Sequence, residues 1–327
     1  MRIIIDAMGG DNAPGEVIKG AVLAARDFDT EIILVGDKEK IGNIDDSRIS
    51  VVHAPEIIGF DEDPVHAVRT KTNSSIVTGL KLLAEGKGDA FVSAGSTGAV
   101  VCGATLLVKR IKGVRRAAIG TVIPTKTGCT LLIDSGANAD CGEDFLLQFA
   151  VMGNAYMKAI MGINSPRIGL LSNGTEETKG SEVVKKAHEL LKNSDINFIG
   201  NVEGTGVLNG ACDVLAADGF SGNVFLKTLE GTAKYFSSEI KGMFMKNLIT
   251  KLCGLIMKGG IKKLKDSFDA EKYGGAPVLG VNGVVIKAHG NAKASAIYNA
   301  VKQAITAVNE DIVGVIGHNI YKNYENT

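Results

Sequence analysis

Short apolar runs alternate with segments of helical periodicity through most of the chain. Several runs are continuous rather than interrupted by polar residues, which is typical of strands that helices cover on both faces. We expect strands over residues 2–6, 31–35, 50–53, 90–93, 117–123, 129–134, 167–172, 197–200, 214–216 and 284–288. Apolar residues at helical spacing predict helices over residues 14–26, 74–85, 97–110, 143–161, 179–192 and 292–316.

This alternation predicts an α/β fold class. It implies a mostly parallel sheet with helices on both faces, which is a three-layer α/β/α architecture. The strands over 117–123 and 129–134 are joined by a short segment, so we expect that pair to be antiparallel. No fixed-period repeat is visible, and residues 1–327 are expected to form a single α/β domain.

One region departs from the alternation. The strand pattern is absent from about residue 222 to 268, and two helical segments are expected to meet near residue 253 and to break at 259–260. We therefore expect a protruding helical excursion over about residues 225–272. Lysines interleave with apolar residues there, so the segment is expected either to pack on a dimer partner or to lie on anionic lipid. Its candidates for a membrane contact or acyl entrance are Met243, Phe244, Leu248, Leu252, Leu255 and Ile256.

Composition narrows the class of protein. The chain has 36 basic and 36 acidic residues, so its net charge gives no reason to expect a nucleic-acid partner. Its five cysteines are widely spaced and contain no CxxC pair, which favours reduced thiols in a cytoplasmic protein over disulfides or zinc. No apolar run reaches the roughly 18 residues that span a bilayer.

Small polar residues and glycines follow six of the expected strands. These loops cover residues 6–14, 94–99, 134–140, 172–180, 217–223 and 288–292. Each opens a helix, where free backbone N–H groups and the helix dipole favour an anion. Ligands of parallel sheets bind at the carboxyl ends of the strands, so we expect the six loops to converge on one crevice that holds an anion.

Several familiar sites are missing from the sequence. There is no GxxxxGK[ST] loop, no GxSxG nucleophile elbow and no HExxH pair. Residues 204–210 imitate a dinucleotide fingerprint, but the last glycine spacing is one residue too long. We therefore expect neither a cofactor nor a metal.

Four motifs together resemble a known family. They are Asp6-Ala-Met-Gly-Gly-Asp-Asn-Ala-Pro14, Ser93-Ala-Gly-Ser-Thr-Gly-Ala99, Ser172-Asn-Gly174 with Lys179-Gly180, and Ala217-Asp-Gly-Phe-Ser-Gly-Asn223. The chain closely resembles the bacterial phosphate acyltransferases of phospholipid synthesis from residue 1 to about 318. The resemblance implies transfer of an acyl group from acyl carrier protein to inorganic phosphate. It also implies a homodimer at the inner face of the cell membrane, with a core similar to the isocitrate and isopropylmalate dehydrogenases.

That chemistry suits a site without a serine or cysteine nucleophile. Phosphate is already anionic, and a thiolate is a good leaving group, so direct attack is natural. The protein must position the phosphate and stabilise the oxyanion that develops at the thioester carbonyl. We expect catalytic roles for Lys179 as the cation, Asn173 as a hydrogen-bond donor and His289 as the proton donor to the thiolate.

The remaining candidates bind phosphate or hold the loops. We expect phosphate-binding groups at Gly95, Ser96, Thr97, Gly98, Asn223 and Asn291. The aspartates would repel phosphate, so we expect them to brace loops by accepting from backbone N–H groups: Asp6, Asp11, Asp134 and Asp218.

A basic cluster lies outside these loops. Its members are Lys109, Arg110, Lys112, Arg115 and Arg116, and an acidic carrier protein is a candidate partner for it. Two alternatives to the long-chain reaction stay open. One is a short-chain phosphate acetyl- or butyryltransferase that uses coenzyme A, and the other is a membrane scaffold without catalysis.

Overall fold

The computed structural model describes residues 1–267 and 270–325, and the side chains of residues 261–271 and beyond 322 are outside its description. Within the described residues, eleven strands form one sheet in the order β3-β2-β1-β4-β11-β10-β5-β6-β9-β7-β8. The strands are β1 Arg2–Asp6, β2 Glu31–Gly36, β3 Ile49–His53, β4 Ala90–Ser93, β5 Ala118–Thr125, β6 Gly128–Ile133, β7 Ile168–Leu171, β8 Phe198–Val202, β9 Val214–Ala216, β10 Ala276–Leu279 and β11 Val284–Lys287.

Helices join and cover these strands. They are α1 Gly15–Asp27, α2 Lys38–Ile41, α3 Pro64–Thr70, α4 Ser75–Ala84, α5 Thr97–Gly103, α6 Glu143–Ala159, α7 Glu182–Lys192, α8 Gly204–Val207, α9 Gly219–Phe244, α10 Leu248–Ser267, α11 Ala294–Asn309 and α12 Ile312–Glu325. Ala104–Val108 extends α5 as a π-helical turn, and Ala270–Tyr273 is a short 3₁₀ helix.

The sheet consists of two parallel blocks that point in opposite directions. The first block is β3-β2-β1-β4-β11, and the second is β6-β9-β7-β8. Between them the pairs β11–β10, β10–β5 and β5–β6 are antiparallel. The expected mostly parallel sheet and the antiparallel pairing of 117–123 with 129–134 are thereby confirmed.

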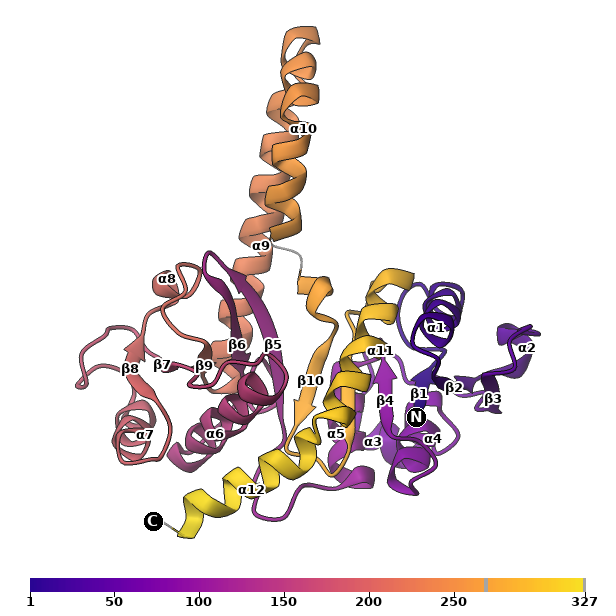
Figure 1. The fold of residues 1–327 in the computed structure, drawn as a ribbon, viewed down its shortest axis with the longest axis horizontal. Coiled ribbons are helices and arrows are strands. Elements are labelled where there is room, and N and C mark those ends of the chain that lie inside the picture. The colour runs from indigo at the N-terminus through magenta and orange to yellow at the C-terminus, as the bar shows by residue number, and fades with distance from the viewer. Residues whose placement is uncertain (268–269, 326–327) are drawn as a thin grey trace.

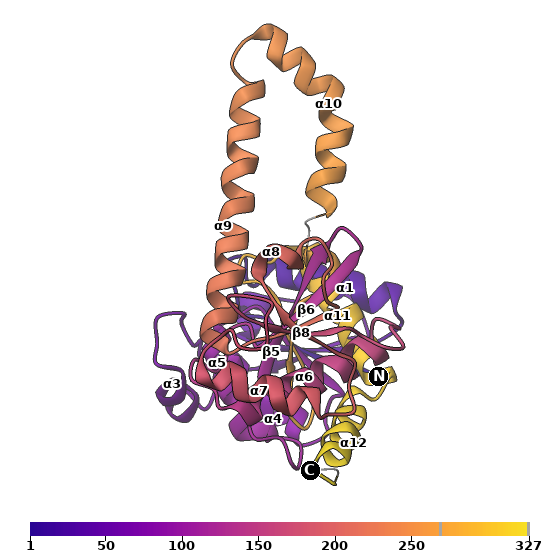
Figure 2. The same cartoon turned by 90° about the vertical axis from the view of Figure 1, so that its left-hand side faces the viewer.

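Helices cover both faces of the first block. Ile3 and Ile5 of β1 pack in the core beneath α1 and α11, whereas Ile4 and Phe91 pack in a second core beneath α4 and α5. Figure 2 shows α1 and α11 on one side of the sheet, and α3, α5 and the lower part of α9 on the other. The three-layer arrangement is therefore confirmed.

Helices α9 and α10 form a hairpin that projects far from the sheet (Figures 1 and 2). The expected meeting of two helices near residue 253 and the expected break at 259–260 are both wrong, because α10 runs without interruption from Leu248 to Ser267. The turn lies earlier, where the Asn247 side chain accepts from Thr250 N at 2.9 Å and Thr250 Oγ1 accepts from Asn247 N at 3.0 Å. This reciprocal cap satisfies two backbone N–H groups at the start of α10. The two glycines at 259–260 offer no such side-chain cap, so the helix does not begin there. None of the described helices is long and apolar enough to cross a membrane.

Two further elements differ from the expectation. Strand β10 was not predicted, because it contains Pro277, and proline normally argues against a central strand. The helix expected over 292–316 is two helices, since the chain turns at Asp311, whose φ of 45° ends α11 and starts α12.

Candidate functional site

The six polar loops lie at two different edges of the sheet. Loops 6–14, 94–99 and 288–292 follow strands of the first block, whereas 134–140, 172–180 and 217–223 follow strands of the second. Because the two blocks run in opposite directions, their carboxyl ends face opposite ways along the strands. The expectation that all six loops meet in one crevice of a single chain is therefore wrong.

A row of buried polar side chains closes the carboxyl edge of the first block. Asp6, Ser93 and Lys287 are the last residues of three adjacent strands, β1, β4 and β11. Lys287 pairs in register with Ser93, and Ser93 Oγ donates to Asp6 Oδ2 at 2.6 Å. Only 1%, 0% and 7% of Asp6, Ser93 and Lys287 are exposed. Three polar side chains in a row inside an apolar sheet indicate a candidate binding site at this edge.

Asp6 holds the first two loops together. It accepts from Met8 N at 3.1 Å, while the Ser93 hydroxyl that donates to it also accepts from Gly95 N at 2.9 Å. Burial raises the pKa of Asp6, and hydrogen bonds from serines and backbone act in the opposite direction. A Cβ on Gly9 would lie 2.5 Å from Gly95 N, so only glycine permits this approach of the two backbones.

The expected phosphate-binding residues of loop 94–99 lie beside this row. Ser96 caps α5 by accepting from Ala99 N at 3.5 Å, and it is 5% exposed. Thr97 is exposed, and Gly98 packs against Pro64 of α3. The loop therefore presents its backbone and the Thr97 hydroxyl at the end of β4.

Loop 288–292 lies next to it at the end of β11. Asp11 N donates to Gly290 O at 2.8 Å, which ties the exposed Asp11 to this loop. His289 and Asn291 are exposed, and Asn291 N donates to His289 Nδ1 at 3.4 Å. An imidazole that accepts at Nδ1 carries its proton on Nε2 when neutral, which leaves that N–H free to donate.

Helix α9 starts at the edge of the second block and passes the first. Its residue Lys227 is close enough to Lys287 for the two charges to interact. Asn223, one of the expected phosphate-binding residues, lies one turn earlier on the same face of α9. Residues from both blocks therefore approach each other along α9, although the loops themselves do not converge.

The second-block aspartates hold the start of α9. Asp134 accepts from the backbone N–H groups of Ile119, Gly136, Ala137 and Asn138 at 2.7–3.1 Å. Asp218 caps α9 by accepting from Ser221 N at 2.8 Å. A Cβ on Gly222 would lie 2.0 Å from Asp134 O, so the helix can dock here only with glycine.

Asn173 and Lys179 lie in a different part of the molecule. Their loop follows β7 and is tied to the neighbouring edge strand by Asn201 Nδ2, which donates to Glu176 O at 2.8 Å. β7 is six positions from β4 in the sheet, which is roughly 29 Å at about 4.8 Å per strand. Both residues are exposed, and the structure does not bring them to the Asp6–Ser93–Lys287 row. Within the described residues, the nearby Ser172 Oγ is buried without a hydrogen-bond partner.

Lys287 is the site residue that the sequence analysis missed. It was included in an expected strand, where a charged residue among Val284, Val285 and Ile286 was the available signal. The pKa of Lys287 is lowered to about 8, chiefly by burial and also by Lys227, whereas Asp6 and Asp11 act in the opposite direction.

Metal ligands and cysteine thiols are the other groups that could carry chemistry in the described part of the chain. It contains no group of three or more His, Cys, Asp or Glu residues that could hold a metal. Burial raises the pKa of the Cys141 thiol to about 11 and of Cys212 to about 12, so neither is an activated nucleophile. A surface depression of about 540 Å³ is formed by residues 105–114, away from the strand-end loops.

The sequence matches a known protein family and several relatives over nearly its whole length. A family model described as "fatty acid synthesis protein" matches residues 1–314. A phosphate acyltransferase of Caldanaerobacter subterraneus is 49% identical over 316 residues, covering 96% of this chain and 95% of the relative. A phosphate acyltransferase of Clostridioides difficile is 44% identical over 334 residues, covering 100% and 98%.

Solved structures with the same fold are more distant in sequence. A phosphotransacetylase from Streptococcus pyogenes aligns with a TM-score of 0.65 at 19% identity and covers 95% of this chain and 94% of its own. A branched-chain phosphotransacylase from Enterococcus faecalis aligns with a TM-score of 0.59 at 13% identity, covering 94% and 99%. At these identities the likeness shows the fold alone.

Proposed function

Because the chain belongs to the fatty acid synthesis protein family and its full-length relatives are phosphate acyltransferases, it is an acyltransferase, and we propose that it transfers a long-chain acyl group from acyl carrier protein to inorganic phosphate. The observation that carries the proposal is the match of phosphate acyltransferases to nearly the whole chain, together with anion-favouring loops around a buried lysine. The product would be an acyl phosphate for phospholipid synthesis.

The proposed reaction is a direct displacement. A phosphate oxygen attacks the thioester carbonyl and forms the new C–O bond. The C–S bond breaks, and its electron pair leaves on the carrier thiolate, which then takes up a proton. Raised thiol pKa values at Cys141 and Cys212 support direct attack over an acyl-enzyme on either thiol.

First-block groups fit the steps of this reaction. Backbone N–H groups and the hydroxyl of Thr97 are suited to hold phosphate at the end of β4. His289 presents Nε2–H, which is suited to donate a hydrogen bond to the leaving thiolate; the expected proton transfer from His289 stays a prediction. The expected roles of Asn173 and Lys179 stay predictions, although their loop is remote from this edge.

The α9–α10 hairpin supports a long acyl chain and a peripheral membrane location. Leu248, Leu255 and Ile256 are 84%, 67% and 78% exposed on α10, and exposed lysines stand near them at 251 and 258. Exposed apolar side chains with flanking lysines favour an anionic lipid surface. The same side chains are also suited to pack on a second copy, so we keep the homodimer as part of the proposal.

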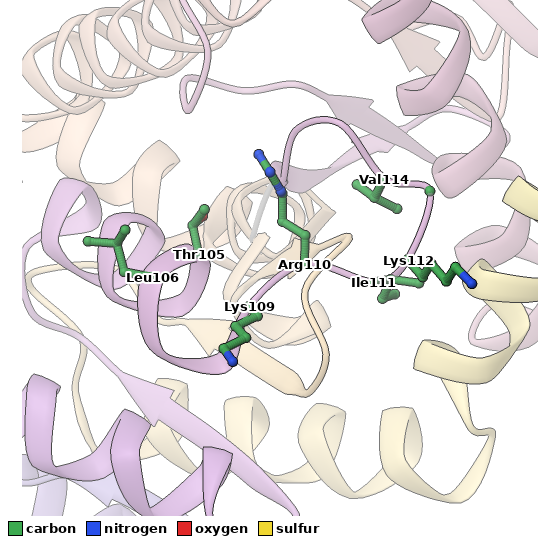
Figure 3. Close-up of a pocket in the computed structure, with 8 residues that line it drawn as sticks. Thr105, Leu106, Lys109, Arg110, Ile111, Lys112 and Val114 are labelled. Atoms are coloured by element: carbon green, nitrogen blue, oxygen red, sulfur yellow. The ribbon is translucent and has the colours of Figure 1, made fainter.

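The basic cluster supports an acidic protein donor. Figure 3 shows Lys109, Arg110 and Lys112 around the depression formed by residues 105–114. Arg110 Nη1 donates to Arg115 O at 2.8 Å, and Arg115 pairs with Asp144, so the loop is held in place. A fixed, exposed basic loop is suited to steer an acidic carrier protein.

The test compares acyl donors in the purified protein. Long-chain acyl-acyl carrier protein, long-chain acyl-coenzyme A and acetyl-coenzyme A are each incubated with and without phosphate, and acyl phosphate is trapped with hydroxylamine. The proposal expects phosphate-dependent product and the highest kcat/KM with the carrier-protein donor. A preference for acetyl-coenzyme A would support the short-chain alternative, which the exposed apolar hairpin does not favour. If product formation does not depend on phosphate, the proposal is refuted.

A further inference from the structure

Lys287 is buried in a position where lysine is rarely found without a partner. It is 7% exposed at the end of β11, and lysines are almost never fully buried unless they are paired. Among the described residues, no carboxylate lies within 4.0 Å of its ammonium, and its one hydrogen bond goes to the adjoining Ala288 carbonyl. An ammonium has three donors, so two have no acceptor in the described part of the chain.

Burying such a charge is costly without a close counter-ion. The carboxylates that act on Lys287, Asp6 and Asp11, do so at longer range, and Asp6 already accepts from Ser93 and Met8. The fold therefore leaves Lys287 without a close counter-ion among the described residues.

A second cation approaches from the opposite element. Lys227 on α9 interacts unfavourably with Lys287, although its own ammonium also pairs with Glu230 at 2.9 Å. The Lys287 side chain is on the α4–α5 face of the sheet, like its strand neighbour Val285, and Figure 2 shows the lower part of α9 on that same side. Two like charges within range of each other are stabilised by an anion that binds both.

Anion-favouring backbone surrounds the same position. Lys287 is the register partner of Ser93, which directly precedes the Gly95–Gly98 segment. His289 and Asn291 follow it within four residues. The unpartnered ammonium, the second cation and the polar loops thus meet at the carboxyl edge of β4 and β11.

We propose that Lys287 binds the anionic acyl acceptor, inorganic phosphate, at the end of β11, with Lys227 of α9 as the second cation. This inference rests on the proposed function. It gives Lys287 the role of the cation, which the sequence analysis expected of Lys179. Lys287 is then a catalytic residue that touches the nucleophile, and α9 links the phosphate site to the projecting hairpin.

The experiment measures phosphate in two independent ways on the full-length protein. One is the KM for phosphate in acyl transfer, and the other is the rise in melting temperature that added phosphate causes. The variants are Lys287→Met, Lys227→Met and the control Lys302→Met, whose lysine is exposed on α11. We expect Lys287→Met to raise the phosphate KM roughly tenfold to a hundredfold, as for a lost charge-assisted hydrogen bond, with an unchanged KM for the acyl donor.

The two lysines also have different signatures against pH. In the wild type, phosphate affinity is expected to fall as pH rises through about 8, where Lys287 loses its proton. Lys227→Met removes a charge that lowers the pKa of Lys287, so that fall is expected at higher pH, with a phosphate KM raised about threefold to tenfold. Lys302→Met is expected to match the wild type throughout.

The outcomes separate this inference from the proposed function. If Lys287→Met is active with an unchanged phosphate KM, or is inactive but keeps the full phosphate-induced rise in melting temperature, the inference is overturned. An unchanged pH profile in Lys227→Met would remove the role of the second cation. If the wild type shows no phosphate-dependent transfer, the proposed function fails, whereas a thermal shift lost only in the lysine variants would still support anion binding.

Discussion

Replacing Lys287 by methionine is expected to stabilise the protein at neutral pH while it removes the anion site. A folded-state pKa of about 8 against an ordinary 10.5 corresponds to roughly 3 kcal/mol of unfavourable free energy in holding the charge at pH 7. Loss of the hydrogen bond to Ala288 offsets about 1 kcal/mol of this. A net gain of about 2 kcal/mol raises the melting temperature of a 327-residue chain by about 3 °C.

The sign of the pH dependence makes this prediction specific. Between pH 8 and 10.5 the unfolded chain binds the Lys287 proton more strongly than the folded one, so wild-type stability due to this group rises with pH in that window. The advantage of Lys287→Met should therefore be largest at pH 7 and shrink towards pH 10.5. The assay is thermal unfolding of both proteins at several pH values without phosphate, with Lys302→Met as the control. A variant less stable than wild type at pH 7, or an advantage independent of pH, would refute the reasoning.

Three further changes address the remaining parts of the account. Ile256→Glu on the hairpin is expected to weaken binding to anionic vesicles about tenfold in sedimentation, because the apolar side chain of Ile256, 78% exposed in the protein, no longer contacts the lipid. Leu23→Glu on α1 is the control and should bind like the wild type. Equal binding by the wild type and both variants would contradict the lipid contact. Lys179→Ala is expected to leave the phosphate KM within about threefold of wild type, since its loop is six strands from β4; a rise equal to that of Lys287→Met would return the cation role to Lys179. Arg110→Glu is expected to raise the KM for the carrier-protein donor about fivefold at low salt and less at high salt; the same KM at both salt concentrations would exclude Arg110 from docking.

The sequence predicted the layers well because the central strands β1, β4 and β11 of the first block are covered on both faces. Continuous runs such as Ile3–Ile5 leave little doubt about burial, and the short link between β5 and β6 indicated their antiparallel pairing. That same reversal makes the second block run the other way. The consequence for the loops was not visible in the sequence, because strand order depends on where the chain crosses back to add β10 and β11 beside β4.

Of the candidate site, the polar loops were predicted from the sequence and the buried lysine was not. Loop composition marks where anions are favoured, and Gly95–Gly98 and Asn291 lie beside the buried polar row. Composition does not say which lysine is buried, because that depends on neighbours far away in sequence. Lys179 follows a polar loop and is exposed, whereas Lys287 follows apolar residues and is enclosed by β4 and β10.

Direct attack by bound phosphate is the central claim, and a single-turnover measurement tests it most directly. Excess protein is mixed with long-chain acyl-acyl carrier protein, and released thiol, acyl phosphate and the intact mass of the protein are followed with and without phosphate. The account predicts no thiol release without phosphate, one acyl phosphate per thiol with it, and no acylated protein at any time. Thiol release without phosphate, accompanied by an acyl group on the protein, would contradict it.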